Sequence, residues 1–137
     1  MTIVVDTREQ RPFSECDAWK DVEIVNEKLD TADYSNGEIL VERKSVNDFI
    51  NCCGKNKKRF MKELDRGFDI LIIEGNINDM QRHLKKRRSR MHINYIISML
   101  KKIRKDYGIE VVMGDSRESA AQFTLHSLLP AGTKTFC

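Results

Sequence analysis

Residues 33–48 read DYSNGEILVERKSVND, and this stretch decides how the first half of the chain is arranged. Asn36-Gly37 is a strong turn signal, because both residues tolerate the positive φ of a tight hairpin turn. The aliphatic segment 39–44 is predicted to be a strand that pairs with the residues before the turn. Ser45 then begins a predicted helix, since Asp48 three residues later completes a relative of the capping box. The stretch therefore predicts a hairpin that leads directly into a helix.

Strands and helices alternate on both sides of this hairpin. Before it, we expect strands over residues 2–5 and 22–25 and a short helix over residues 14–20. After it, the expected strands are 68–73 and 109–113, and the expected helices are 55–66, 91–107 and 115–129. This order predicts an α/β fold with a mixed central sheet flanked by helices.

The length of 137 residues predicts one domain over residues 1–130, followed by a flexible C-terminal tail over residues 131–137. The longest apolar run, 70–73, is far too short to span a membrane, and the N-terminus lacks the features of a signal peptide. The four cysteines have no spacing typical of a disulfide framework. We therefore expect an intracellular protein with no membrane partner, cytoplasmic in general and nuclear if it comes from a eukaryote or a nuclear virus.

Charge is distributed unevenly along the chain. Residues 1–54 carry six Lys and Arg against twelve Asp and Glu, whereas residues 55–105 carry sixteen against five. Acidic groups that collect divalent cations, beside a basic surface that attracts phosphate, are one arrangement for nucleic-acid chemistry. Solvated charged faces are the alternative, and composition alone leaves both open.

Asp33, Glu42 and Lys44 are the candidate chemical residues from the pattern itself. Residues two apart in a strand share a face, so Glu42 and Lys44 project together while Arg43 projects oppositely. The hairpin returns Asp33 to the same strand, and a divalent cation resolves the repulsion of two adjacent carboxylates. A metal that polarises phosphate and a cation that offsets negative charge suit phosphodiester hydrolysis. A cross-strand ion pair on a solvated face is the competing interpretation.

Three motifs carry a resemblance to a known family: VDTRE at 5–9, ADY at 32–34 and ERKSVND at 42–48. They resemble the nuclease domain of the XPF-type structure-specific endonucleases, which has a GDY element and an ERKxxxD motif. That domain belongs to the restriction-endonuclease-like PD-(D/E)XK superfamily. Segments 71–75, 107–109 and 118–121 continue the similarity, so the resemblance covers nearly the whole chain.

The resemblance implies a site for Mg²⁺ or Mn²⁺ and a set of catalytic residues. Its implied metal ligands are Asp33, Glu42, Asp6 and the main-chain carbonyl of Arg43. Lys44 is the implied catalytic lysine. The first motif adds Arg8 and Glu9 to Asp6, as a cluster that would hold a second metal or the scissile phosphate. The role of Asp48 stays open between active-site support and helix capping.

Two departures from the family pattern bear on these expectations. Ala32 replaces the glycine of GDY, a mild change unless the backbone needs a positive φ there. The tandem helix-hairpin-helix domains that grip duplex DNA in cellular relatives have no counterpart in this sequence. We therefore expect basic residues of the domain to bind DNA phosphates. They are Lys55, Lys57, Lys58, Arg59 and Lys62, then Arg82, Lys85, Lys86, Arg87, Arg88 and Arg90. The second group is predicted to form a phosphate-binding loop, with a solvated loop or a nuclear-import signal as alternatives.

The activity implied by the resemblance is a metal-dependent DNA endonuclease that cuts branched, flapped or junction DNA in repair or recombination. It also implies a homodimer formed through the C-terminal helices, and a separate DNA-binding or replication and repair partner remains open. The apolar Phe123, Leu125, Leu128 and Leu129 favour such an interface. Two alternatives remain: a non-catalytic DNA-binding scaffold subunit and an RNA-directed nuclease.

Overall fold

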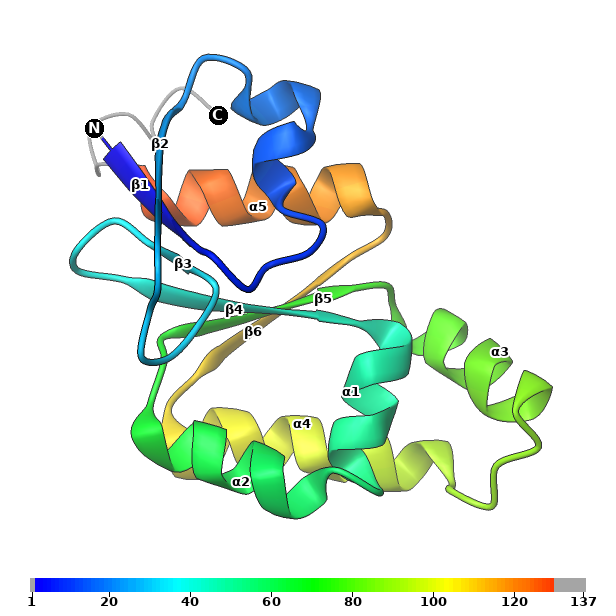
Figure 1. The fold of residues 1–137 in the computed structure, drawn as a ribbon. Coiled ribbons are helices and arrows are strands. Elements are labelled where there is room, and N and C mark those ends of the chain that lie inside the picture. Colours follow the sequence, from blue (N-terminus) through cyan, green and yellow to red (C-terminus); the bar gives the residue numbers. More distant parts are fainter. Residues whose placement is uncertain (1, 130–137) are drawn as a thin grey trace.

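The computed structural model describes residues 2–129, which form a six-stranded mixed sheet with helices on both faces (Figure 1). The strand order is β2-β1-β3-β4-β5-β6. The strands are β1 (Thr2–Asp6), β2 (Glu23–Glu27), β3 (Tyr34–Ser35), β4 (Leu40–Ser45), β5 (Ile70–Glu74) and β6 (Glu110–Gly114). The predicted α/β class and the predicted hairpin of β3 with β4 are confirmed.

The short strand β3 runs antiparallel to both of its neighbours, β1 and β4. The other neighbouring pairs, β1 with β2, β4 with β5 and β5 with β6, are parallel. The carboxyl ends of β1, β4, β5 and β6 therefore meet at one edge of the sheet, where the chain also enters β3. Open α/β sheets generally bind ligands at this edge.

Helices divide into two layers, one on each face of the sheet (Figure 1). One face carries α5 (Arg117–Leu128) and the two 3₁₀ turns Phe13–Glu15 and Asp17–Trp19. The other face carries the four remaining helices, and each layer packs on its own apolar cluster. Those helices are α1 (Val46–Cys53), α2 (Lys57–Arg66), α3 (Ile77–Lys86) and α4 (Ile93–Tyr107).

Helix α1 follows β4 without a loop, because Ser45 ends the strand and caps the helix. The Ser45 Oγ accepts a hydrogen bond of 3.1 Å from the main-chain N–H of Asp48, as the sequence predicted. Buried Val46, Phe49 and Ile50 then fix α1 against the sheet. The carboxyl end of β4 is therefore held rigidly between a sheet and a capped helix.

Three local predictions were wrong. The helix expected over 14–20 is two 3₁₀ turns, each closed by main-chain bonds. Helix α5 begins two residues later than the expected start at 115, because its N-cap is Ser116, whose side chain accepts from the Ser119 N–H. Helix α3 was not predicted at all, although Asn76 and Asp79 form a complete capping box at its start.

No helix between residues 2 and 129 is both long and apolar enough to cross a membrane. The predicted tail over 131–137 lies outside the described residues.

Candidate active site

Sheet register brings Asp6, Asp33 and Glu42 into one row across β1, β3 and β4. Val5 pairs with Tyr34, which pairs with Val41. Because β3 is antiparallel to its neighbours, the following residue of β1 and of β4 lies in one row with the residue that precedes Tyr34. Two main-chain bonds extend this pairing, from Asp6 N–H to the Asp33 carbonyl (2.8 Å) and from Asp33 N–H to the Val41 carbonyl (2.9 Å). Three carboxylates from distant parts of the sequence thus meet where the strands end.

The row forms part of a polar cleft of about 630 Å³. Lys44 lies in this cleft with the three acids, as the alternation along β4 predicted. Helix α2 contributes a further group of charged side chains that faces them. The cleft is lined by Asp6, Arg8, Gln10, Asp30, Thr31, Ala32, Asp33, Glu42, Lys44, Arg59, Glu63 and Arg66.

Asp33 and Glu42 form a strained pair of acids. Glu42 is only 7% exposed, and burial, followed by the hydrogen bond and charge of Asp33, raises its pKa well above the ordinary value. The Arg43 main-chain N–H donates to Asp33 Oδ2 at 2.8 Å, which fixes that carboxylate against β4. Paired oxygen ligands that repel each other are the donor set a hard divalent cation requires, so the pair fits Mg²⁺ or Mn²⁺. Residues 2–129 contain no group of three or more His, Cys, Asp or Glu arranged to hold a metal.

Both carboxylate oxygens of Asp6 accept hydrogen bonds from protein groups. It is 3% exposed, its Oδ1 accepts from the Leu29 N–H at 2.9 Å, and its Oδ2 accepts from Arg8 Nε at 2.9 Å. Burial raises the pKa of Asp6, but these hydrogen bonds outweigh it and the net shift is downward. Asp6 therefore stays ionised and ties Arg8 and the loop after β2 to the edge of the cleft.

Lys44 is held as an ammonium ion inside the cleft wall. Its side chain is 18% exposed, and its Nζ lies 3.5 Å from Glu63 Oε2 and 5.8 Å from the centre of the Phe60 ring. Burial lowers the pKa of Lys44, but Glu42 and other nearby acids outweigh it and raise the pKa overall. Sequence reasoning missed Glu63, since nothing along the chain links α2 to this strand.

Arg43 leaves β4 on the opposite face, as the alternation predicted. Its Nη1 lies 3.0 Å from Glu9 Oε1 and its Nε lies 2.6 Å from Glu74 Oε1. Arg117 adds a third contact, with its Nη1 3.7 Å from Glu74. The Arg43 side chain therefore belongs to a charge network behind the cleft, while its main chain contacts Asp33.

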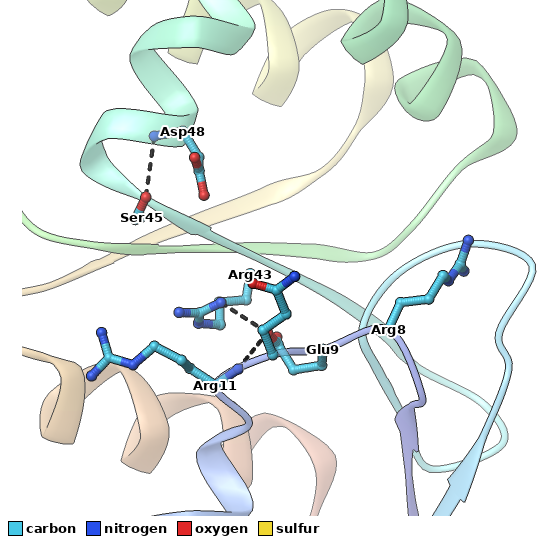
Figure 2. A pocket seen from close by; sticks show the side chains of 7 residues that line it. Arg8, Glu9, Arg11, Arg43, Ser45 and Asp48 are labelled. Carbon is cyan, nitrogen blue, oxygen red and sulfur yellow. Dashed lines mark hydrogen bonds and ion pairs between the residues drawn. The ribbon is translucent and has the colours of Figure 1, made fainter.

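A second cavity of about 360 Å³ lies on that opposite side (Figure 2). The 8–11 loop and the start of α1 enclose it, and Arg8 and Gln10 border both cavities. Asp48 lines this second cavity rather than the cleft, so the structure does not bring it together with Asp33 and Glu42. The bond of Asp48 to Ser45 is made by its main-chain N–H, so the role of the Asp48 carboxylate stays a prediction.

Ala32 occupies a strained position directly before Asp33. Its φ is +70°, a left-handed conformation that costs a residue with a side chain roughly 1–2 kcal/mol. The exception stated for this replacement therefore applies, because the backbone has a positive φ here and alanine in place of glycine is strained. The strain lies beside one of the two paired acids.

The predicted DNA-binding residues divide between two helices. On α2, only Arg59 lines the cleft, and it is joined there by Arg66, which was not predicted. Lys58 and Lys62 are exposed on the same helix, Lys55 is exposed before it, and Lys57 donates to the Tyr95 hydroxyl.

The loop predicted for residues 82–90 is wrong in its first half, which is helical, whereas phosphate binding by these residues stays a prediction. Arg82, Lys85 and Lys86 lie on α3, and Arg82 pairs with Asp79 on the same helix. Arg87 caps α3 and donates to the side chains of Asn47 and Asn51 at 2.9 Å each, which ties α3 to α1. Arg88 and Arg90 follow the helix and are exposed.

The apolar residues of α5 pack mainly inward. Leu128 is fully buried and Leu125 packs against the core, whereas Phe123 is 46% exposed. Most of the apolar excess that favoured a dimer interface is therefore used by the core of this chain.

Comparison with known proteins identifies the family. The ERCC4 domain model matches residues 5–126. The 3′-flap repair endonuclease Xpf of Saccharolobus solfataricus is 31% identical over 107 residues, which is 74% of this chain and 42% of that protein. This chain therefore spans about two fifths of the length of that relative.

Solved structures agree with this assignment at the level of the fold. XPF from Aeropyrum pernix matches with a TM-score of 0.76, and its complex with DNA matches with 0.75. Both are 23% identical and cover 98% of this chain and 66% of theirs. The α/β fold with a mixed sheet flanked by helices, expected from the sequence, is thus similar to the fold of these structures. The chain belongs to the ERCC4 domain family, as an XPF-type nuclease domain.

Proposed function

We propose that this chain is a divalent-metal-dependent DNA endonuclease that acts on branched or flapped DNA. One observation carries the proposal: the register of β1, β3 and β4 that aligns Asp6, Asp33 and Glu42 in a cleft with Lys44. A relative is a 3′-flap repair endonuclease, and a structural neighbour was solved with DNA, which supports the substrate class.

Asp33 and Glu42 are the proposed ligands of Mg²⁺ or Mn²⁺, with the carbonyl of Arg43 as a further proposed ligand. A cation bound there would supply Lewis acidity at the phosphate. Water attacks the phosphorus, the bond to the 3′ oxygen breaks, and a 5′-phosphate and a 3′-hydroxyl result. The Lys44 ammonium offsets the negative charge that develops in this step. Arg8, held by Asp6 at the cleft edge, orients the phosphate.

Basic residues of the cleft wall and of helix α3 are proposed to hold the DNA backbone. Arg59 and Arg66 extend the cleft wall along α2, and Lys85 and Lys86 expose their charge on α3. Such contacts give affinity without base sequence, and each phosphate contact contributes about −0.9 to the salt slope of duplex binding. Replacing Lys85 by Ala should therefore flatten the slope without changing the preferred DNA structure.

The test is cleavage of labelled flap, fork, Holliday-junction, duplex and single-stranded DNA with Mg²⁺, Mn²⁺ or a chelator. An RNA strand of the same sequence is included. Asp33→Asn and Lys44→Ala are compared with the parent protein, with circular dichroism to check folding. Metal-dependent cleavage of DNA that is lost in both folded variants is the expected result, and it would rank the substrates.

Binding to DNA without cleavage in either metal would favour the alternative of a scaffold subunit. Preferred cleavage of RNA would mean that the substrate is RNA rather than DNA.

A homodimer through α4 and α5 is also proposed, because Phe123 and Tyr95 are exposed on these helices. Sedimentation measures this oligomeric state directly.

A further inference from the structure

We propose that Glu63 of α2 is the positioning residue that aims the Lys44 ammonium into the cleft. This inference rests on the nuclease function proposed above. No sequence motif singles out Glu63, which lies 19 positions after Lys44 and on a different element. The structure brings the two together, with 3.5 Å between Lys44 Nζ and Glu63 Oε2.

Helix α2 presents two groups to Lys44 from one side. Phe60 and Glu63 are three residues apart and therefore lie on the same helix face. The Phe60 ring is fully buried and lies 5.8 Å from the ammonium, while the Glu63 carboxylate is 20% exposed at the cleft wall. The aromatic ring limits where the ammonium can lie, and the carboxylate gives it a charged acceptor. Together they define one orientation of a side chain with four rotatable bonds.

A half-buried ammonium needs a counter-charge, and Glu42 is poorly suited to provide it alone. Glu42 lies beside Asp33 in the acid row and is a proposed ligand of the divalent cation, which would use its charge. Glu63 comes from outside the acid row, so it balances Lys44 without competing for that cation. Without Glu63, the ammonium would turn toward Glu42, because that is the next acid on the same face of β4.

Single-turnover cleavage and DNA affinity separate this role from others. Glu63→Ala should slow the single-turnover rate by about 10–100-fold, the usual effect of removing a group that orients an active-site residue. The Kd for DNA, measured by anisotropy in Ca²⁺, should stay unchanged. Glu63→Gln should recover part of the rate, because its amide oxygen still accepts a hydrogen bond from Lys44. Asp65→Ala, an exposed acid on the same helix outside the cleft, is the matched control.

A double-mutant cycle tests whether Glu63 acts through Lys44. If it does, Lys44→Ala combined with Glu63→Ala should be no slower than Lys44→Ala alone. Rate losses that multiply would overturn the proposal, as would a Glu63→Gln rate no higher than that of Glu63→Ala. A rise in the Mn²⁺ concentration for half-maximal rate in Glu63→Gln would instead make Glu63 a metal ligand and also overturn it.

The same measurements distinguish failure of the proposed nuclease function from failure of the positioning role of Glu63. Absence of cleavage by the parent protein would refute the function itself. Cleavage by the parent that is lost in Lys44→Ala but kept in Glu63→Ala would refute only the positioning role. Thermal unfolding of each variant excludes loss of the fold as the cause.

Discussion

Glu42 and Arg43 are neighbours in one strand, yet the two faces of β4 balance charge in opposite ways. On the cleft face, burial, and after it the neighbouring Asp33, raises the pKa of Glu42. On the opposite face, Arg43 lies between Glu9 and Glu74 and is joined by Arg117. The two acids of the cleft face repel each other, whereas the charges of the opposite face neutralise each other. Uncompensated acids in a cleft are typical of a ligand-binding site, whereas charges that are already paired are typical of structural contacts.

The largest expected effect is on the rate of cleavage, when the repulsion between Asp33 and Glu42 is removed. Glu42→Gln keeps the shape of the side chain and its hydrogen bond with Asp33 but removes the ionisable group. Cleavage should fall by about 10²–10³-fold or more, because the cation loses a ligand worth several kcal/mol in the transition state. The free energy of unfolding should rise by about 1 kcal/mol, as is common when a strained functional group is replaced. Urea titration and single-turnover cleavage measure both changes.

A Glu42→Gln protein that is less stable than the parent would contradict this account. It would mean that the carboxylate is compensated within the fold, as Arg43 is on the other face. Asn26→Ala on the exposed strand β2 provides a control for the stability measurement.

The next effect is a loss of stability on the opposite face. Arg43→Ala leaves Glu9 and Glu74 without their main partner, and both carboxylates are largely buried. Breaking a buried pair in this way costs about 3–5 kcal/mol of unfolding free energy. The loss should exceed that of Lys44→Ala, the control two positions along the strand. Unchanged stability together with lost cleavage would show that the Arg43 side chain acts in the cleft after all.

The difference between the two faces could be predicted only in part from the sequence. The period of two along a strand places Glu42 and Lys44 together and Arg43 apart, and the Asn36-Gly37 turn returns Asp33 to the same edge. The partners of these residues come from segments far along the chain. Arg43 pairs with Glu9 and Glu74 at separations of 34 and 31 residues, and only tertiary packing creates such contacts.

Two other features could be predicted only incompletely from the sequence, for different physical reasons. Helix α3 carries few apolar residues, so its charged surface suggested a loop, although Asn76 and Asp79 offered a capping signal. The motif glycine that Ala32 replaces pointed to a possible positive φ, but the value of +70° is set by how β3 enters the sheet edge.

Metal binding should stabilise the folded protein through the acids of the cleft face and not through the charges of the opposite face. Without metal, burial and Asp33 raise the pKa of Glu42 above its ordinary value of 4.5. The folded protein therefore keeps a proton that the unfolded chain releases, and this contribution to stability falls as the pH rises above that ordinary value. Mg²⁺ should reverse the fall, by about 2.7 kcal/mol at one hundred times its Kd. Because binding displaces the proton, the gain should increase with pH.

Thermal unfolding with and without Mg²⁺, across a series of pH values, measures this effect. Glu42→Gln should lose the Mg²⁺ response, whereas Arg43→Ala should keep it despite its lower stability. An equal Mg²⁺ response in parent and Glu42→Gln would place the cation elsewhere on the protein.

The smallest expected effect is on stability, when Arg117 is removed from the charge network behind the cleft. Arg117 donates to the carbonyls of Arg11 and Pro12 at 3.0 and 3.1 Å, and its weaker contact with Glu74 completes the network. Arg117→Ala should lower the unfolding free energy by about 1–2 kcal/mol, since charged donors to main-chain carbonyls are lost while Arg43 still neutralises Glu74. The exposed Lys101→Ala on α4 provides a matched control. Cleavage per folded molecule should stay at the parent rate, because the network lies behind the cleft. A loss of cleavage by about tenfold or more would mean that the two faces of β4 are coupled.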